Sequence, residues 1–351
     1  MQVRFYLRVA ATLLLALAAA LLCRWLHTPL PWILGPLLAT GMATVLRAPT
    51  ESWTPLRNIG QCTIGIALGL YFTPQVTALV LGLWWVIALG IAWALALGWG
   101  FGLWLHRLNT RHIPGGLNRA TTWFAGAIGG ASEMTLLAER AGGRTDLVAS
   151  AHSMRLLLVT VLIPFGMQFS GLHGLDLLPP AVRVVHAPGL LLLFLLAGLG
   201  AWVLARLDRA NPWFLGALLV AMGFTMADIQ LSALPVWLSN TAQLFIGVSL
   251  GVRFTPAFVH TAPRWLATVA LGTLGLLALC ALLALGMAWL TGLHPATLVL
   301  ATAPGGIAEM SITAKVLQLG APVVTAFQVC RLIAVLLLVE PLFRWRHGQL
   351  R

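Results

Sequence analysis

Charged residues are scarce in this chain. Only 9% of its 351 residues are Asp, Glu, Lys or Arg, and nine acidic residues stand against 21 basic ones. Soluble domains carry about a quarter charged residues. The mean hydropathy of +0.92 and the hydrophobic fraction of 60% point the same way. The composition therefore excludes an ordinary water-soluble globular protein.

Cysteine and histidine clusters are also lacking. The four cysteines, at positions 23, 62, 280 and 330, lie far apart without a CxxC pair, and the nine histidines form no HExxH motif. We expect free thiols, no metal and no other cofactor. The formal net charge of +12 is spread over loops between apolar runs. That spacing fits charges that orient membrane segments, and we expect no nucleic-acid partner.

Long apolar runs dominate what is present. A membrane-spanning helix needs about 20 mostly apolar residues, and five stretches approach or pass that length: Leu7–Leu26, Thr77–Leu105, Ala187–Leu204, Trp265–Leu293 and Ala326–Leu342. The first follows Arg4 and Arg8 as a signal peptide would, but no clean cleavage site follows it, so we interpret it as a spanning helix. The sequence predicts an all-α integral membrane protein in contact with the lipid bilayer.

The chain contains an internal repeat. Gln61–Pro74 aligns without gaps on Gln243–Pro256, with eight of fourteen positions identical. Flanking blocks align in the same order, with spacings of 176 to 182 residues: Pro31-Trp32 with Pro212-Trp213, Gly129-Gly130 with Gly305-Gly306, Glu133 with Glu309, and Arg155 with Arg331. We infer a tandem duplication, with Met1–Ser170 as the first membrane repeat and Gly171–Arg351 as the second.

Each half predicts the same series of helices. The series comprises a long helix, a helix opened by Pro-Trp, a Gly-rich helix, a long uncharged helix and, after the Gly-Gly segment, a last apolar helix with an internal arginine. In the first half these are Leu7–Leu26, Pro31–Leu46, Leu56–Tyr71, Thr77–Leu105 and Val148–Phe165; in the second, Pro188–Leu207, Pro212–Met226, Pro235–Val252, Trp265–Leu293 and Pro322–Leu338.

The two Gly-Gly segments are too short to span. Ala120–Ala131 and Ala296–Ala308 hold about 12 apolar residues each, enough for half a helix, and we expect the glycines to break it. If both segments re-enter, each half crosses five times and the halves have inverted topology. If both segments cross the membrane, the chain has 12 spans and the two halves have parallel topology. The positive-inside rule favours about ten spans plus two re-entrant hairpins, with both termini cytoplasmic.

The candidate site follows from the duplicated motifs. Gly129, Gly130, Gly305 and Gly306 form the two turns, and a carboxylate follows each turn at Glu133 and Glu309. Carboxylates at membrane depth are costly, which makes both candidates for carrying a proton, binding a cation or pairing with a base. Arg155 and Arg331 lie 22 residues later in each half. Static ion pairs between the carboxylates and these arginines remain the alternative.

Other polar residues could line a pathway. Gln61 and Gln243 lie in the Gly-rich helices, and Ser132, Ser311 and Thr313 lie close to the carboxylates. Interhelical hydrogen bonding is the alternative use of the glutamines. The glycines spaced by four residues in the Gly-rich helices, at 65, 69, 247 and 251, are typical of close helix packing.

The Pro-Trp-x-x-Gly, Gln-x-x-x-Gly-x-x-x-Gly-x-x-Phe-Thr-Pro and Gly-Gly-x-x-Glu-Met blocks resemble the bacterial AbrB-duplication membrane family, whose members are often labelled "AbrB family transcriptional regulator" or "putative ammonia monooxygenase". The resemblance covers nearly the whole chain and implies the bacterial inner membrane. The pattern of Leu30–Val45 and Leu56–Tyr71 is also similar to helices of cation–proton antiporters and anion carriers with broken helices.

We expect a secondary active transporter, not an enzyme, for a small solute, with anions among the candidates, coupled to H⁺ or Na⁺, because inverted repeats with paired broken helices are typical of such carriers. A homodimer is compatible with the sequence. Three alternatives remain: a channel, a membrane-embedded regulator of gene expression acting through a partner protein, and a membrane oxidase. The oxidase lacks a ligand cluster for copper or iron, and the sequence shows no soluble DNA-binding module.

Overall fold

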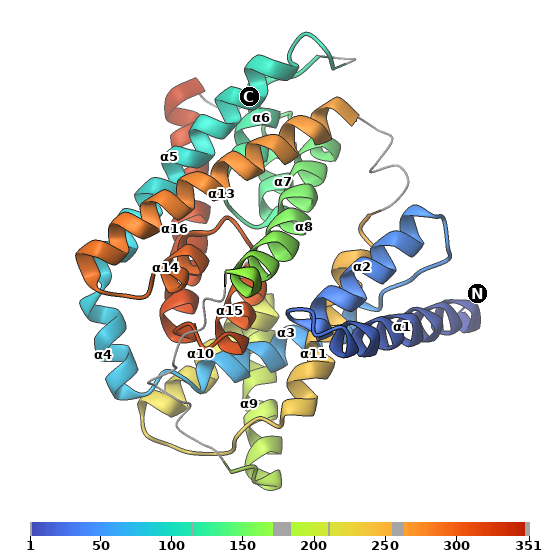
Figure 1. Ribbon diagram of the computed structural model, residues 1–351, viewed down its shortest axis with the longest axis vertical. Coiled ribbons are helices and arrows are strands. Elements are labelled where there is room, and N and C mark those ends of the chain that lie inside the picture. Colours follow the sequence, from blue (N-terminus) through green and yellow to red (C-terminus); the bar gives the residue numbers. More distant parts are fainter. Residues whose placement is uncertain (1, 114–115, 171–183, 210, 255–262, 348–351) are drawn as a thin grey trace. The chain divides into compact units, whose positions relative to one another are not determined.

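The protein is described from a computed structural model, which places all residues except 1, 114–115, 171–183, 210, 255–262 and 348–351. Over these described residues the chain forms fifteen helices and no strand (Figure 1). The all-α prediction is confirmed to that extent. The predicted repeat boundary at Gly171 and the Thr255-Pro256 end of the second long motif lie outside the described residues.

Six of the described helices are long and apolar enough to cross a membrane. They are α1 (Gln2–Trp25), α5 (Trp84–Asn109), α8 (Thr145–Phe169), α9 (Ala187–Arg206), α13 (Pro263–Thr291) and α16 (Ala321–His347). Large apolar side chains on them are exposed, including Leu14, Leu282 and Trp289. Water would disfavour so much exposed apolar surface, whereas lipid would not. These helices indicate a membrane-embedded protein.

The chain divides into two compact units. The first unit comprises Met1–Leu81, Pro164–Ala257 and Ser311–Pro322, and the second comprises Gly82–Ile163, Phe258–Met310 and Val323–Arg351. Each unit therefore takes segments from both halves of the sequence, so the compact units differ from the inferred sequence repeats.

Helices of the two sequence halves pack against each other in the first unit. Here α2 (Pro31–Val45) packs on α11 (Val236–Gly251), and α3 (Thr54–Gly69) packs on α10 (Pro212–Met226). A Cβ on Gly247 would come within 2.6 Å of the Ile33 carbonyl oxygen, and one on Gly69 within 2.8 Å of that of Leu218. The glycines thus let the helix backbones approach closely. The close packing predicted from their spacing is present.

Local sequence explains where α2 and α10 begin. Leu30 and Asn211 adopt left-handed conformations, with φ of 46° and 53°, and a proline follows each as the first helical residue. Proline suits that position because its fixed φ is helical and its missing N–H would be unpaired there anyway. Both predicted Pro-Trp helix starts are confirmed.

One predicted helix is wrong in its continuity. Thr77–Leu105 was expected to form a single long helix, but α4 (Pro74–Gly82) ends before Leu83 and α5 starts at Trp84. Leu83 has φ −91° and ψ 11°, outside the helical region. The break follows Gly82, a poor helix former with open space around it. Hydropathy does not reveal this break because the residues on both sides are apolar.

The second unit holds the short helices of the Gly-Gly segments. They are α6 (Arg119–Gly126), α7 (Ala131–Arg140), α14 (Pro295–Thr302) and α15 (Ile307–Val316), the last continuing into the first unit. In this unit α6 packs on α5 and α14 packs on α13. Gly126 requires close approach, since a Cβ there would lie 2.6 Å from the Gly98 carbonyl oxygen on α5. The long helices thereby hold the short ones in place.

Candidate functional site

The first break separates α6 from α7. Asn118 caps the start of α6 by accepting a hydrogen bond from the Thr121 N–H at 2.9 Å. Helix α6 ends because Ala127 turns extended, with φ −56° and ψ 136°. Gly130, also extended, is the N-cap of α7. The predicted interruption at Gly129-Gly130 is confirmed, and it leaves the last carbonyls of α6 and the first N–H groups of α7 without helical partners.

The second break repeats this geometry. His294 caps α14, accepting from the Ala296 N–H at 3.3 Å, and α14 ends where Ala303 adopts φ −55° and ψ 140°. Helix α15 then starts at Ile307, directly after Gly306. The two breaks match within a few degrees at the residue where the backbone leaves the helix. Equivalent sequences in the two halves thus form equivalent local structures.

Each carboxylate folds back over the glycine before its helix. Glu133 and Glu309 are the third residues of α7 and α15, and a Cβ on Gly130 or Gly306 would collide with their Oε2 atoms. An acidic side chain at this position lies near the free N–H groups and the positive end of the helix dipole. The missing Cβ of the glycine makes room for it. This explains why a glycine stands three residues before the glutamate in both breaks.

The two carboxylates differ in burial. Glu309 is buried, with 7% of its surface exposed, while Glu133 is half-buried. Ser132, next to Glu133, is exposed, and Ser311 and Thr313, which belong to the first unit, are fully buried. Of the two carboxylates, Glu309 is the more buried.

The arginines bind the opposite side of each break. Arg155 on α8 donates to the carbonyl oxygen of Ala127 at 2.9 Å and, over longer distances, to those of Ala125 and Gly126. Arg331 on α16 donates to the carbonyl oxygens of Ala303 and, at 2.9 Å, Gly305. Both guanidiniums therefore satisfy carbonyls at a helix C-terminus, whose partial negative charge favours a cation.

The alternative of a static Glu133–Arg155 ion pair finds no support in this geometry. Among the described residues no ion pair joins Glu133 to Arg155. Arg155 is buried, with 3% of its surface exposed, and its charge is met by main-chain carbonyls and His152. Each break therefore has an acidic group at one helix end and a basic group at the other.

Sequence reasoning missed two further residues. His152 contacts the Phe124 carbonyl oxygen at 2.9 Å through Nε2 and Arg155 at 2.8 Å through Nδ1. A carbonyl can only accept and an arginine can only donate, so Nε2 carries the proton and the ring is neutral in this arrangement. Gln328 donates to the carbonyl oxygens of Leu300 and Ala303 at 2.8 and 3.2 Å. The two occupy equivalent positions but are not identical, so a search for identical residues passes over them.

The two breaks are coupled by reciprocal packing. A Cβ on Gly129 would meet Val335 of α16 at 3.0 Å, and one on Gly305 would meet Val159 of α8 at 2.9 Å. Each break thus packs against the helix whose arginine serves the other break. The guanidiniums of Arg155 and Arg331 also lie within electrostatic range of each other. The second unit therefore brings Gly129, Gly130, Glu133, Arg155, Gly305, Gly306, Glu309 and Arg331 into one centre.

The two predicted glutamines belong to the first unit. Gln61 donates to the Asn211 side-chain oxygen at 3.1 Å, and Gln243 is buried, with 6% of its surface exposed. The Gln61–Asn211 bond joins α3 to the residue that precedes α10. For Gln61 this is the interhelical hydrogen bonding that stood as the alternative to a pathway role.

Comparisons with known proteins identify relatives over most of the chain. A family model described as "Transition state regulatory protein AbrB" matches residues 32–347. The chain is 28% identical over 342 residues to "Uncharacterized protein YhjN" of Bacillus subtilis, covering 90% of this chain and 87% of that protein. It is 26% identical over 322 residues to "Putative regulator AbrB" of Escherichia coli, covering 89% and 88%. No solved structure gives a significant match.

Proposed function

Since the chain belongs to the AbrB family, as the match to residues 32–347 establishes, we propose that this membrane-embedded member is a secondary active transporter of a small anionic solute. The observation that carries the proposal is the pair of arginine-capped helix breaks in one unit. Broken helices at membrane depth are stable only where protein or a watery cavity surrounds them, and transporters use their free helix ends to bind solutes and ions.

The proposal includes a topology. Besides the six long helices, α2, α3, α10 and α11 have 15 or 16 residues each and complete a set of ten spans. Helices α6–α7 and α14–α15 then enter and leave the bilayer as two re-entrant hairpins. Five spans per half give the halves inverted orientation, with both termini in the cytoplasm of a bacterium and the basic loops on that side of the inner membrane.

Charge at the centre favours an anion coupled to a proton. The centre contains two arginines, two carboxylates and four helix ends, and each helix end carries about half a charge. These charges nearly cancel when both carboxylates are ionised. Protonation of Glu309 leaves the centre positive by about one charge, which attracts a monoanion. Loss of the proton then expels it. We favour H⁺ over Na⁺ because Arg155 and Arg331 would repel a metal cation. No catalytic step is proposed.

The test is anion binding to purified protein. Acetate, lactate, phosphate, sulfate and neutral amino acids are screened by thermal shift at pH 5.5 and pH 8. A ligand at 100 times its Kd stabilises the folded state by about 2.7 kcal/mol. We expect one class of monoanion to stabilise the protein more at pH 5.5, and to be taken up into proteoliposomes when the outside is acidic.

Arginine variants provide the control. Arg331→Gln should abolish the thermal shift by removing a buried positive charge, while Arg107→Gln, on the exposed end of α5, should leave it unchanged. Absence of any anion-dependent shift at both pH values, or an undiminished shift in Arg331→Gln, would remove the basis for an anion transporter.

A second candidate function comes from the names of the family and of one relative. The family model is described as a regulatory protein and the Escherichia coli relative as a putative regulator. A membrane-embedded chain could regulate gene expression only through a partner protein. If a strain lacking the gene shows altered transcription that Arg331→Gln restores as well as the wild type does, regulation is independent of transport. If only transport-competent variants restore it, altered transcription follows from the transported solute.

A further inference from the structure

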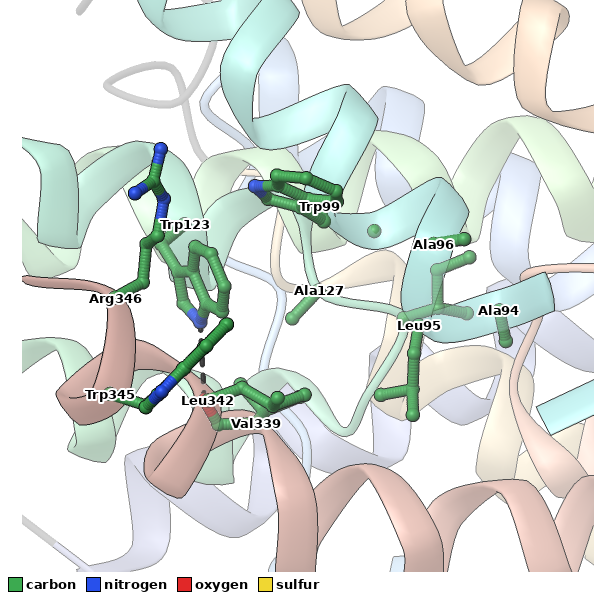
Figure 2. A pocket seen from close by; sticks show the side chains of 12 residues that line it. Ala94, Leu95, Ala96, Trp99, Trp123, Ala127, Val339, Leu342, Trp345 and Arg346 are labelled. Atoms are coloured by element: carbon green, nitrogen blue, oxygen red, sulfur yellow. Dashed lines mark hydrogen bonds between the residues drawn. The ribbon is translucent and has the colours of Figure 1, made fainter. Parts of the chain in front are cut away.

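An apolar cavity of about 240 Å³ lies in the second unit, beside the first break. Three segments line it: part of α5, the end of α6 with the break that follows, and the last turns of α16. Figure 2 shows Arg346 and Trp345 at one end and Ala94 and Leu95 at the opposite end. The remaining lining residues are Ala96, Gly98, Trp99, Trp123, Ala127, Ile128, Val339 and Leu342.

The walls are hydrocarbon and aromatic. The indole N–H of Trp123 is already used, since it donates to the Val339 carbonyl oxygen at 3.3 Å, the bond drawn in Figure 2. Trp99 and Trp345, on helices long enough to cross a membrane, are exposed at the cavity. A cavity between such faces opens toward lipid, and it fits a flexible hydrocarbon chain better than a hydrated solute.

The end of the cavity at Arg346 is basic. His347, the next residue, lies within electrostatic range of both Arg346 and Arg119, which places the charges of these two arginines close to this end. Its ring packs on Trp123 and Phe343, with centroids 5.6 and 4.8 Å apart, which holds it beside the cavity wall. Arg344 differs, because Glu340 pairs with it. A hydrocarbon slot with cations at one end matches a molecule that has an apolar tail and an anionic head.

We propose that the cavity binds one anionic phospholipid, with an acyl chain along α5 and its phosphate at Arg346 and Arg119. Seating the chain there brings its methylene groups into van der Waals contact with the tryptophans of the lining and fills the space between α5 and α16. Lys and Arg near a membrane surface attract anionic headgroups. Ala127 and Ile128 line the cavity and belong to the first helix break, so the bound acyl chain also packs against that break. This proposal does not depend on the transported solute.

The experiment measures lipid retention by the full chain. Protein purified in detergent is titrated with phosphatidylglycerol or with phosphatidylcholine of the same acyl chains, followed by native mass spectrometry and thermal shift. We expect phosphatidylglycerol to be retained preferentially, and Arg346→Gln to reduce that preference by about fivefold, the effect of one basic residue at a membrane surface. Arg107→Gln, a basic residue of α5 outside the cavity lining, should leave the preference intact.

A second pair of variants tests the cavity itself. Ala96→Phe places a ring in the space claimed for the acyl chain and should abolish retention of either lipid. Ala92→Phe, on the same helix but outside the lining, should not. Equal retention of both lipids by the wild type, or equal retention by Ala96→Phe and Ala92→Phe, would overturn the proposal. Equal stabilisation by inorganic phosphate would assign the basic end to a free anion and overturn it too.

Discussion

The Oε2 atom of Glu309 occupies the space into which a Cβ on Gly306 would project, and Glu133 stands in the same relation to Gly130. The glycine and the carboxylate of each break are therefore structurally interdependent. Neither glycine has a positive φ, so space and not backbone conformation requires glycine here.

Alanine at these glycines should destabilise the protein. Gly306→Ala and Gly130→Ala force the carboxylate off the helix N-terminus or distort the turn, at a cost of about 1–3 kcal/mol. Thermal unfolding in detergent measures the effect. Gly286→Ala is the matched control, because it lies inside α13 with open space around it, and it should stabilise slightly. Wild-type stability of Gly306→Ala would contradict the geometry, whereas the double variant Gly130→Ala/Glu133→Ala should recover much of the loss.

Replacement by lysine should destabilise the protein more at Arg155 than at Arg331. Arg155 has four acceptors in three carbonyls and His152, while Arg331 donates to two carbonyls and its Nε has no partner in the described structure. Lysine keeps the charge but lacks the planar fork. Arg155→Lys should therefore cost more stability, by about 1–3 kcal/mol for each buried group left unpaired. Equal melting temperatures for Arg155→Lys and Arg331→Lys would contradict this ranking.

Repetition made much of the site predictable from sequence. The Gly-Gly breaks, the carboxylates behind them and the paired arginines recur at fixed spacing, and a short apolar run ending in Gly-Gly cannot continue as a helix. The burial of these repeated residues and their close packing in the second unit follow from that arrangement.

Other parts could not be predicted because they depend on tertiary contacts. A glutamate and an arginine with opposite charges suggest a pair, but the free carbonyls of α6 attract Arg155 and the free N-terminus of α7 accommodates Glu133. Such backbone groups have no sequence signature of their own. The partners His152 and Gln328 differ in residue type, and the α4–α5 break lies in a uniformly apolar stretch.

Cysteine labelling tests the proposed inverted halves. In a chain with its four free cysteines replaced, single cysteines are introduced at Thr110 and His294, both exposed. His294 is preferred to Gly292, whose φ of 69° would strain a side chain. An impermeant maleimide added to intact cells should label position 294 and spare position 110 until the membrane is opened. Labelling of both positions from the same side would exclude five spans per half.

The carboxylates should contribute unequally to coupling. Glu309 is buried at the second break, whereas Glu133 is half-buried at the first. Protonation of Glu309 therefore changes the charge of an enclosed site, where solvent screens it little. Glu309→Gln fixes that site in its positive form. We expect it to bind the identified anion as tightly at pH 8 as at pH 5.5 and to exchange it across proteoliposome membranes, while losing accumulation driven by a pH gradient. Glu133→Gln should keep the pH dependence of the wild type. If Glu309→Gln still accumulates the anion against its gradient, the proton is carried elsewhere. If both variants lose pH dependence together, the two breaks titrate as one coupled group.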